Sequence, residues 1–194
     1  MKNNDGWFYI LRDDETRNVI KTWWEKVSGE YKIDKQNYPK AISAILRRCV
    51  SSEDALLTEG FRLLWLSLPT YWQQKTEYML SLASLAAVLA HVRKNETDFS
   101  FANSLGREKE KTKKPYFSVL RFQQLQQSRD LMELQRRMIQ AVKLLNESVN
   151  ILSIADNILH WAHERNGNIA QKPMERLAVR WSTQYFIKLS EYQT

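Results

Sequence analysis

The stretch from Phe101 to Leu145, FANSLGREKEKTKKPYFSVLRFQQLQQSRDLMELQRRMIQAVKLL, decides the fold of this 194-residue chain. It begins with a lysine-rich segment and continues into two amphipathic helical patterns. In the second pattern, apolar residues fall within about 60° of one another at roughly 100° per residue: Leu131, Leu134, Met138, Val142 and Leu145. Polar residues project from the opposite side: Arg136, Gln140 and Lys143. We therefore predict a helix with one face in the core and a basic outer face.

The first pattern predicts a helix over residues 115–127, with Val119, Phe122 and Leu125 on its inner side. Residues 128–130 interrupt it. Asp130 and Glu133 have the spacing of a capping box, which predicts that the next helix begins there.

The rest of the chain has the same helical periodicity and no alternating strand pattern. An extended arm is predicted over 7–11, and Gly29 is predicted to end the first helix. Further helices are predicted over 38–49 and over 72–93. Another is predicted to begin at a cap over 51–54 and to end at Pro69, and two more are predicted to begin after Asn150 and at Pro173. Residues expected to face inward include Ile42, Ile45, Leu46, Cys49, Met174, Leu177, Trp181, Tyr185 and Leu189.

These patterns predict an all-α protein of about eight helices in a compact bundle. The length allows one domain or two very small ones, with an N-terminal helical part over 1–95 and a C-terminal helical part over 96–194. The apolar run from Met79 to Val92 should form the central helix, because it is apolar on most faces. It is too short to span a bilayer, which takes about 20 apolar residues.

Charge indicates the kind of partner. The formal net charge is +7, and basic residues are dense in the segment after Leu105. Flexible lysines on such a loop reach a phosphate backbone without reading bases. The alternative is that these basic residues contact no partner, and belong to a solvent-exposed connecting loop and to the solvent-exposed face of an amphipathic helix. The single cysteine, Cys49, excludes an intramolecular disulfide, and we expect it to be a small buried thiol. The first residues lack a signal-peptide pattern, so we expect a cytoplasmic protein.

Catalytic and metal-binding patterns are missing from the sequence. It has no glycine-rich phosphate loop, no nucleophile with a spaced base, and no carboxylate cluster for two metals. His160 and His163 lie three residues apart but have no cysteine nearby and no HExxH motif, which is a weak zinc signal. We expect no enzyme activity, no cofactor and no metal.

Five pieces of the sequence, in this order, together resemble one known family. They are ILRRC at 45–49, SLGREKEK at 104–111, SVLRFQQLQQSRD at 118–130, ELQRRM at 133–138, and LHW at 159–161 with VRWSTQYF at 179–186. They resemble the CasB family, the small subunit of the type I-E CRISPR surveillance complex called Cascade.

The resemblance implies a non-catalytic, all-helical subunit of two small helical sub-bundles that binds nucleic acid without sequence preference. It also implies partners: other Cascade subunits, the guide RNA (crRNA), both strands of the target DNA in the R-loop, and a second copy of the subunit. Pairing reads the sequence in such systems, while protein surfaces stabilise the open strands.

The residues expected to contact nucleic acid lie in matched segments or in the lysine-rich loop. They are Arg107, Lys109, Lys111, Lys113, Lys114, Arg121, Arg129, Arg136, Arg137 and Lys143, with Arg47, Arg48 and Arg165 as additions. A different class of function stays open: a structural helical adaptor whose basic faces contact acidic proteins.

Overall fold

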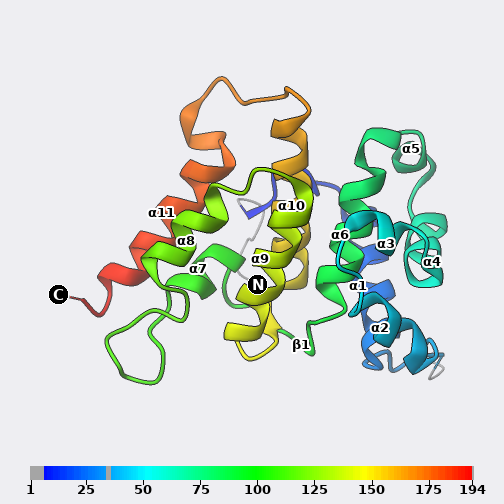
Figure 1. The fold of residues 1–194 in the computed structure, drawn as a ribbon, viewed down its shortest axis with the longest axis horizontal. Coiled ribbons are helices and arrows are strands. Elements are labelled where there is room, and N and C mark those ends of the chain that lie inside the picture. Colours follow the sequence, from blue (N-terminus) through cyan, green and yellow to red (C-terminus); the bar gives the residue numbers. More distant parts are fainter. Residues whose placement is uncertain (1–6, 34–35, 194) are drawn as a thin grey trace.

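The computed structural model describes residues 7–33 and 36–193, and nearly all of its regular structure is helical (Figure 1). In chain order the elements are α1 (Asp14–Ser28), α2 (Lys40–Leu46), α3 (Ser52–Leu56), α4 (Glu59–Ser67), α5 (Thr70–Gln73), the 3-10 turn η2 (Thr76–Tyr78), α6 (Met79–Leu89), β1 (Lys94–Asn95), α7 (Phe101–Gly106), α8 (Val119–Gln126), α9 (Leu131–Leu144), β2 (Ser148–Val149), α10 (Ile151–Arg165), the 3-10 turn η3 (Pro173–Glu175) and α11 (Leu177–Ser190). Eight of the described α-helices have seven residues or more, so the predicted all-α fold is confirmed.

Side-chain caps explain where several helices begin. Asp13 accepts a hydrogen bond from the Thr16 N–H at 2.7 Å, at the start of α1. Ser51 and Asp54 form a complete capping box at α3. Each cap provides an acceptor for backbone N–H groups that have no partner within the helix. Gly29 ends α1 with a left-handed φ of 85°, as the sequence predicts.

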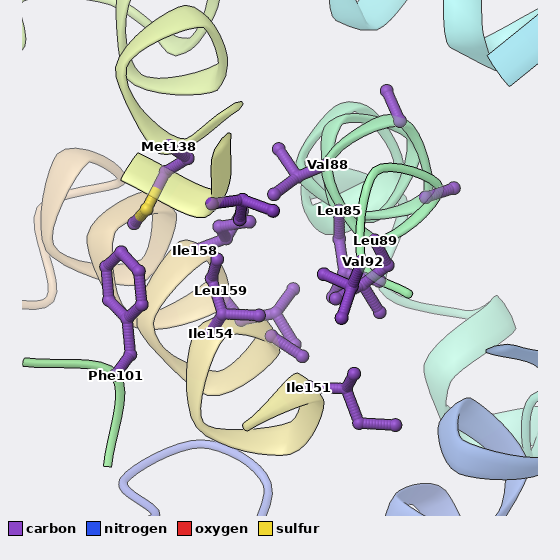
Figure 2. Packing of buried hydrophobic residues seen from close by; sticks show 14 of the residues in the cluster. Leu85, Val88, Leu89, Val92, Phe101, Met138, Ile151, Ile154, Ile158 and Leu159 are labelled. Atoms are coloured by element: carbon purple, nitrogen blue, oxygen red, sulfur yellow. The ribbon is translucent and has the colours of Figure 1, made fainter. Parts of the chain in front are cut away.

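Helix α6 is the centre of the core. Every residue from Ser81 to Ala90 is buried, and α6 contacts α3, α4, α9 and α10. Figure 2 shows the packing between α6 with the turn after it and α10, which involves Leu85, Val88, Leu89 and Val92 on one side and Ile151, Ile154, Ile158 and Leu159 on the other. Full burial of each aliphatic side chain contributes about 2 kcal/mol. The predicted central helix is therefore confirmed.

The helices lie on two sides of this centre. In Figure 1, α1 to α5 lie on one side of α6, and α7, α8 and α11 lie on the other. Helices α7 and α11 pack closely at Gly106, where a Cβ atom would overlap the carbonyl oxygen of Tyr185. One hydrophobic cluster includes residues from both groups of helices. The division into parts 1–95 and 96–194 stays a prediction.

The N-terminal arm is held by a single buried carboxylate. Asp156 of α10 accepts hydrogen bonds from the backbone N–H groups of Tyr9, Ile10 and Leu11, at 2.7–3.0 Å. Burial raises the pKa of the Asp156 carboxyl, and the three N–H donors oppose that rise. Residues 7–11 therefore pack as an arm, as predicted, but the arm is not extended, because Tyr9 and Ile10 bend around the Asp156 carboxylate.

Two predicted helices are interrupted. The predicted helix over 72–93 is instead α5, η2 and α6. Because the Trp72 indole donates to Thr16 Oγ1 at 2.9 Å, α5 packs on α1, and the chain needs η2 to reach the axis of α6. The predicted helix before Pro69 divides at Thr58, whose hydroxyl accepts the Phe61 N–H and so starts α4.

Two other helices begin later than predicted. Helix α8 begins at Val119, because Ser118 caps it and residues 115–117 belong to the preceding loop. Val119 is consequently 37% exposed and does not face the core. Pro173 opens only the turn η3, and α11 begins at Leu177. Met174 is therefore 64% exposed, and the prediction that it faces inward was wrong.

Two short strands were not predicted. β1 and β2 pair in parallel, with Lys94 opposite Ser148 and Asn95 opposite Val149. They join the turn after α6 to the turn after α9. In the part of the chain that the structure describes, no helix combines the length and hydropathy that a membrane span requires.

Candidate nucleic-acid interface

A groove with a volume of about 720 Å³ lies between the outer face of α9 and the segment that joins α2 to α3. The side-chain amide of Gln135 donates to the Cys49 carbonyl oxygen at 3.3 Å and ties the two walls together. We call this cavity the basic groove. Its lining residues are Cys49, Val50, Arg129, Asp130, Met132, Glu133, Arg136, Ile139, Gln140 and Lys143.

Three exposed cations of the basic groove have no carboxylate partner. Arg129, Arg136 and Lys143 make no ion pair with any described residue. The prediction that Arg136, Gln140 and Lys143 lie on the outer face of α9 is confirmed, since all three are exposed. Unpaired cations on a rigid helix are available to an anionic partner without first breaking a salt bridge.

The two carboxylates of the basic groove are already engaged at the start of α9. Asp130 accepts the Glu133 N–H at 2.8 Å and caps the helix, as predicted. Glu133 pairs with Arg137 at 2.6 Å and accepts the Arg129 N–H at 2.8 Å. A complete capping box would have Glu133 accept the N–H of the cap residue Asp130. Here Glu133 accepts the N–H of Arg129 instead. These acids stabilise α9 and leave the arginines and the lysine uncompensated.

The end of the basic groove next to Lys143 gathers further charge. Arg47 and Arg48 are exposed at the end of α2. Burial lowers the pKa of His91, and the nearby charges of Lys143 and Arg47 lower it further. Residues 96 positions apart in the sequence therefore contribute to one electrostatic environment.

Aliphatic side chains form the remaining lining of the basic groove. Val50 and Met132 are 76% and 56% exposed, and Ile139 is half-buried between them and the cations. Two inward predictions for α2 were wrong here: Ile45 is 51% exposed, and Cys49 is only half-buried. Burial and the charge of Asp54 raise the pKa of the Cys49 thiol, which keeps it protonated at neutral pH.

Sequence reasoning missed these apolar residues. The only signal in the sequence was Met132, an apolar residue that helical spacing places on the same face as Arg136, Gln140 and Lys143. Cys49 and Val50 line the basic groove only because α3 contacts α9. These helices are about eighty positions apart in the sequence, so no local sequence pattern indicates the contact.

The lysine-rich segment forms a second basic surface, the basic finger (residues 107–116). Glu108 and Pro115 form an antiparallel bridge, and the Lys109 N–H donates to the Lys114 carbonyl oxygen at 2.8 Å. Glu108 also accepts the Lys113 N–H at 2.7 Å. Glu110, Lys111 and Lys113 have left-handed φ angles without being glycine. The lysines Lys109, Lys111, Lys113 and Lys114 are all exposed.

Two arginines flank the basic finger differently. Arg107 lies at its base, with the guanidinium 4.3 Å from the centre of the Phe99 ring. Arg121 is exposed on α8 and forms no ion pair with a described residue. Only Arg121 presents its whole charged group outward.

Two arginines from the predicted set have internal partners. Arg137 donates to the Gln124 carbonyl oxygen and to Ser128 Oγ, in addition to its pair with Glu133. Arg165 donates to the Ser128 carbonyl oxygen at 2.7 Å and lies over the Trp161 ring. Both guanidinium groups therefore fix the turn between α8 and α9. Glu133 and Arg137 are four residues apart on one helix, and this spacing is the sequence signal that Arg137 has an internal ion pair.

The two histidines of α10 are engaged separately. His160 is buried and stacks on Tyr9 with ring centres 3.9 Å apart. His163 Nδ1 lies 2.6 Å from the Tyr78 hydroxyl. Within residues 7–33 and 36–193, no three histidine, cysteine, aspartate or glutamate side chains are grouped so that they could share a metal ion.

Comparison with known proteins identifies the family. The family model described as CRISPR-associated protein Cse2 matches residues 43–186, which is more than half of the chain. No curated protein and no solved structure matches the chain. All five sequence pieces that resemble CasB lie within or at the edge of the matched range. The chain therefore belongs to the Cse2 family, also called CasB, which is the small subunit of the type I-E Cascade complex.

Proposed function

We propose that this Cascade small subunit binds the sugar–phosphate backbone of nucleic acid in the basic groove, without sequence specificity. The observation that carries the proposal is the set of unpaired cations on one wall, Arg129, Arg136 and Lys143, with Arg47 near the last of them. Phosphate contacts position a strand but read no bases.

The consequence for the complex follows from the energetics of strand exchange. R-loop formation is a near-balanced exchange of one duplex for another, so modest contacts to the backbone shift it toward the open state. The subunit acts without catalysis, in the cytoplasm. Its partners are other Cascade subunits, crRNA, both strands of the target DNA and a second copy of itself. The basic finger adds a second set of contacts through its four lysines, and Arg107 and Arg121 flank it.

Arg137 and Arg165 act differently in this proposal. Their guanidinium groups already donate to the turn at Ser128, so they position α8 and α9. Arg48 adds charge at the end of α2 beside Arg47. The cations that face solvent provide the binding energy.

The test is fluorescence anisotropy of the full chain with single-stranded DNA, duplex DNA and RNA of unrelated sequences. We expect binding to all three with little dependence on sequence. The logarithm of the affinity should fall linearly with the logarithm of the salt concentration. Affinity that changed by orders of magnitude with sequence, or that did not depend on salt, would contradict the proposal.

A structural adaptor is the second candidate, and one observation favours it. The aliphatic lining of Val50, Met132 and Ile139 suits an apolar protein segment as well as an unpaired base. An adaptor should not retard DNA in an electrophoretic mobility-shift experiment even at low salt. Retardation that Arg136→Gln weakens would exclude the adaptor as the only function of the basic groove.

A further inference from the structure

A second basic cavity lies beyond the end of α9. It has a volume of about 740 Å³ and lies between α1, the segment after it, and β1. Its lining has four cations against two carboxylates: Lys21, Lys32, Arg93 and Lys94 against Glu25 and Glu30. We call it the β1 cavity. None of these four cations belongs to the segments that suggested nucleic-acid binding from the sequence.

The turn after α9 links the β1 cavity to the end of the basic groove. Lys143 lines the basic groove, and Glu147 follows it by four residues. The Glu147 carbonyl oxygen accepts the N–H groups of both Arg93 and Lys94, at 2.8 and 3.1 Å. The turn after α9 thus places the cations of β1 directly after the last cation of the basic groove.

His91 lies at the junction. It precedes Arg93 by two residues, and the charges of Lys143 and Arg47 both act on its imidazole. The groups that face it from neighbouring elements are Lys143 in the last turn of α9, Glu147 after that helix, and Arg47 at the end of α2. A strand that leaves the basic groove past Lys143 meets a half-buried imidazole, and the nearby carboxylate of Glu147 is already paired with Arg93 at 2.6 Å.

Arg93 is paired with Glu147, but two other cations of the β1 cavity, Lys21 and Lys94, are only weakly neutralised. Lys94 is exposed and forms no ion pair with a described residue. The nearest carboxylate oxygen to Lys21 Nζ belongs to Glu25, at 3.9 Å, and half of the Lys21 side chain is exposed. Tyr31 adds an aromatic ring to the lining, which an unpaired base can contact.

We propose that the β1 cavity continues the nucleic-acid track, so that one strand runs from the basic groove past His91 to Lys21 and Lys94. This inference rests on the proposed function. It adds a second binding site for the phosphodiester backbone of a single strand, and it places that site on the N-terminal half of the chain.

The test uses the full chain and oligothymidylates of about 4 to 16 nucleotides, the range of site sizes common among single-strand binding domains. The double variant Lys21→Gln, Lys94→Gln removes two cations of the β1 cavity. The control, Arg62→Gln with Lys172→Gln, removes two exposed cations that each pair with a glutamate at 3.6 Å. Lys172 belongs to the segment between α10 and α11. Figure 1 shows this segment at the opposite edge of the molecule from β1.

For long strands we expect the slope of log affinity against log salt to fall by about 1.4 in the double variant, from about 0.7 per lost contact. For the shortest strands, which fill only one cavity, the variant should bind within about twofold of the wild-type protein, since a strand already held in the basic groove loses no contact. The control should match the wild-type protein at every length.

The outcomes separate the two proposals. A wild-type protein that binds, with a double variant equal to the control for long strands, would overturn the continuous track and leave the proposed function intact. A wild-type protein that bound no strand at low salt would overturn the proposed function itself. Circular dichroism of each variant confirms that the helices are retained.

Discussion

The basic groove and the basic finger are both positively charged, but they are built in opposite ways. The cations of the basic groove come from α9 and the turn before it, and Arg47 at the end of α2 lies near Lys143 only because the core brings these elements together. The cations of the basic finger come from one continuous run of sequence, and backbone hydrogen bonds within residues 107–116 hold the run.

The basic finger has the higher density of charge, but the basic groove holds its cations in a more defined arrangement. The lysines of the basic finger extend into solvent, so fixing each of them on a phosphate costs about 0.5–1.5 kcal/mol of side-chain entropy. In the basic groove the cations share the lining with the apolar side chains of Met132 and Ile139, and we expect their stems to pack on these side chains and lose less entropy on binding. We therefore expect each cation in the basic groove to contribute more to binding than each lysine of the basic finger.

Removing two cations of the basic groove should have the largest effect. For Arg136→Gln with Lys143→Gln we expect the affinity for single-stranded DNA to fall about 25-fold at 0.1 M salt, because each lost contact removes about 0.7 from the salt slope. Anisotropy titrations over a range of salt concentrations measure both quantities. The pair Arg62→Gln with Lys172→Gln is again the control, and an equal loss in that control would show that net charge alone matters.

Crowding the root of the basic finger should affect stability. The Cβ of Gly106→Ala would overlap the Tyr185 carbonyl oxygen, so α7 and α11 must move apart. We expect the free energy of unfolding to fall by about 1–3 kcal/mol, as measured by urea denaturation. Gly167→Ala is less informative about packing, because a Cβ at Gly167 meets no atom within 4 Å. An unchanged free energy of unfolding in Gly106→Ala would show that α7 and α11 can accommodate a Cβ at this position, which contradicts the prediction.

Neutralising the basic finger should have a smaller effect than its charge suggests. For the fourfold change of Lys109, Lys111, Lys113 and Lys114 to glutamine, we expect affinity to fall less than about tenfold at 0.1 M salt, although four charges are lost. The same anisotropy titration measures it. A loss larger than that of Arg136→Gln with Lys143→Gln would reverse the ranking of the two surfaces.

Acid should strengthen binding slightly at the junction of the basic groove. The pKa of His91 is lowered in the fold, so His91 is neutral at pH 7, and the fold loses stability as the pH falls from 6.5 toward that lowered pKa. A phosphate beside His91 favours its protonated form, so affinity should rise less than about fivefold as the pH falls below 6.5. His91→Gln should abolish this rise, and a rise that persists in that variant would assign the pH dependence to other groups.

The sequence predicts most of the fold because its strongest signals are periodic and local. The α9 stripe and the all-round apolar α6 are confirmed, and so are the caps at Asp130 and Ser51. The errors occur where a single distant contact overrides the local pattern. Trp72 holds α5 against α1 and breaks a helix that periodicity alone would continue.

The candidate site was only partly predictable for the same reason. The wheel separates Arg136 from the core face, but it does not show that Val50 lies across a cavity from it. Nor does it show that Arg165, far along the chain, donates to Ser128. Of the adjacent arginines Arg136 and Arg137, only Arg137 has side-chain partners among the described residues. The sequence spacing indicates its pair with Glu133, but its bonds to Gln124 and Ser128 depend on the packing of α8 on α9.

These neighbouring arginines give the most direct test of the central claim, that unpaired cations of the basic groove bind nucleic acid. Arg136→Gln and Arg137→Gln remove the same charge from adjacent positions of one helix. We expect Arg136→Gln to reduce the salt slope by about 0.7 and leave stability unchanged.

We expect Arg137→Gln to lower the free energy of unfolding by about 2 kcal/mol, because it leaves Glu133 and two acceptors at the turn unpaired. Its salt slope should change less than that of Arg136→Gln. Anisotropy and urea denaturation on both variants decide the matter. Equal losses of binding in the two variants, or a larger loss in Arg137→Gln without loss of stability, would contradict the account.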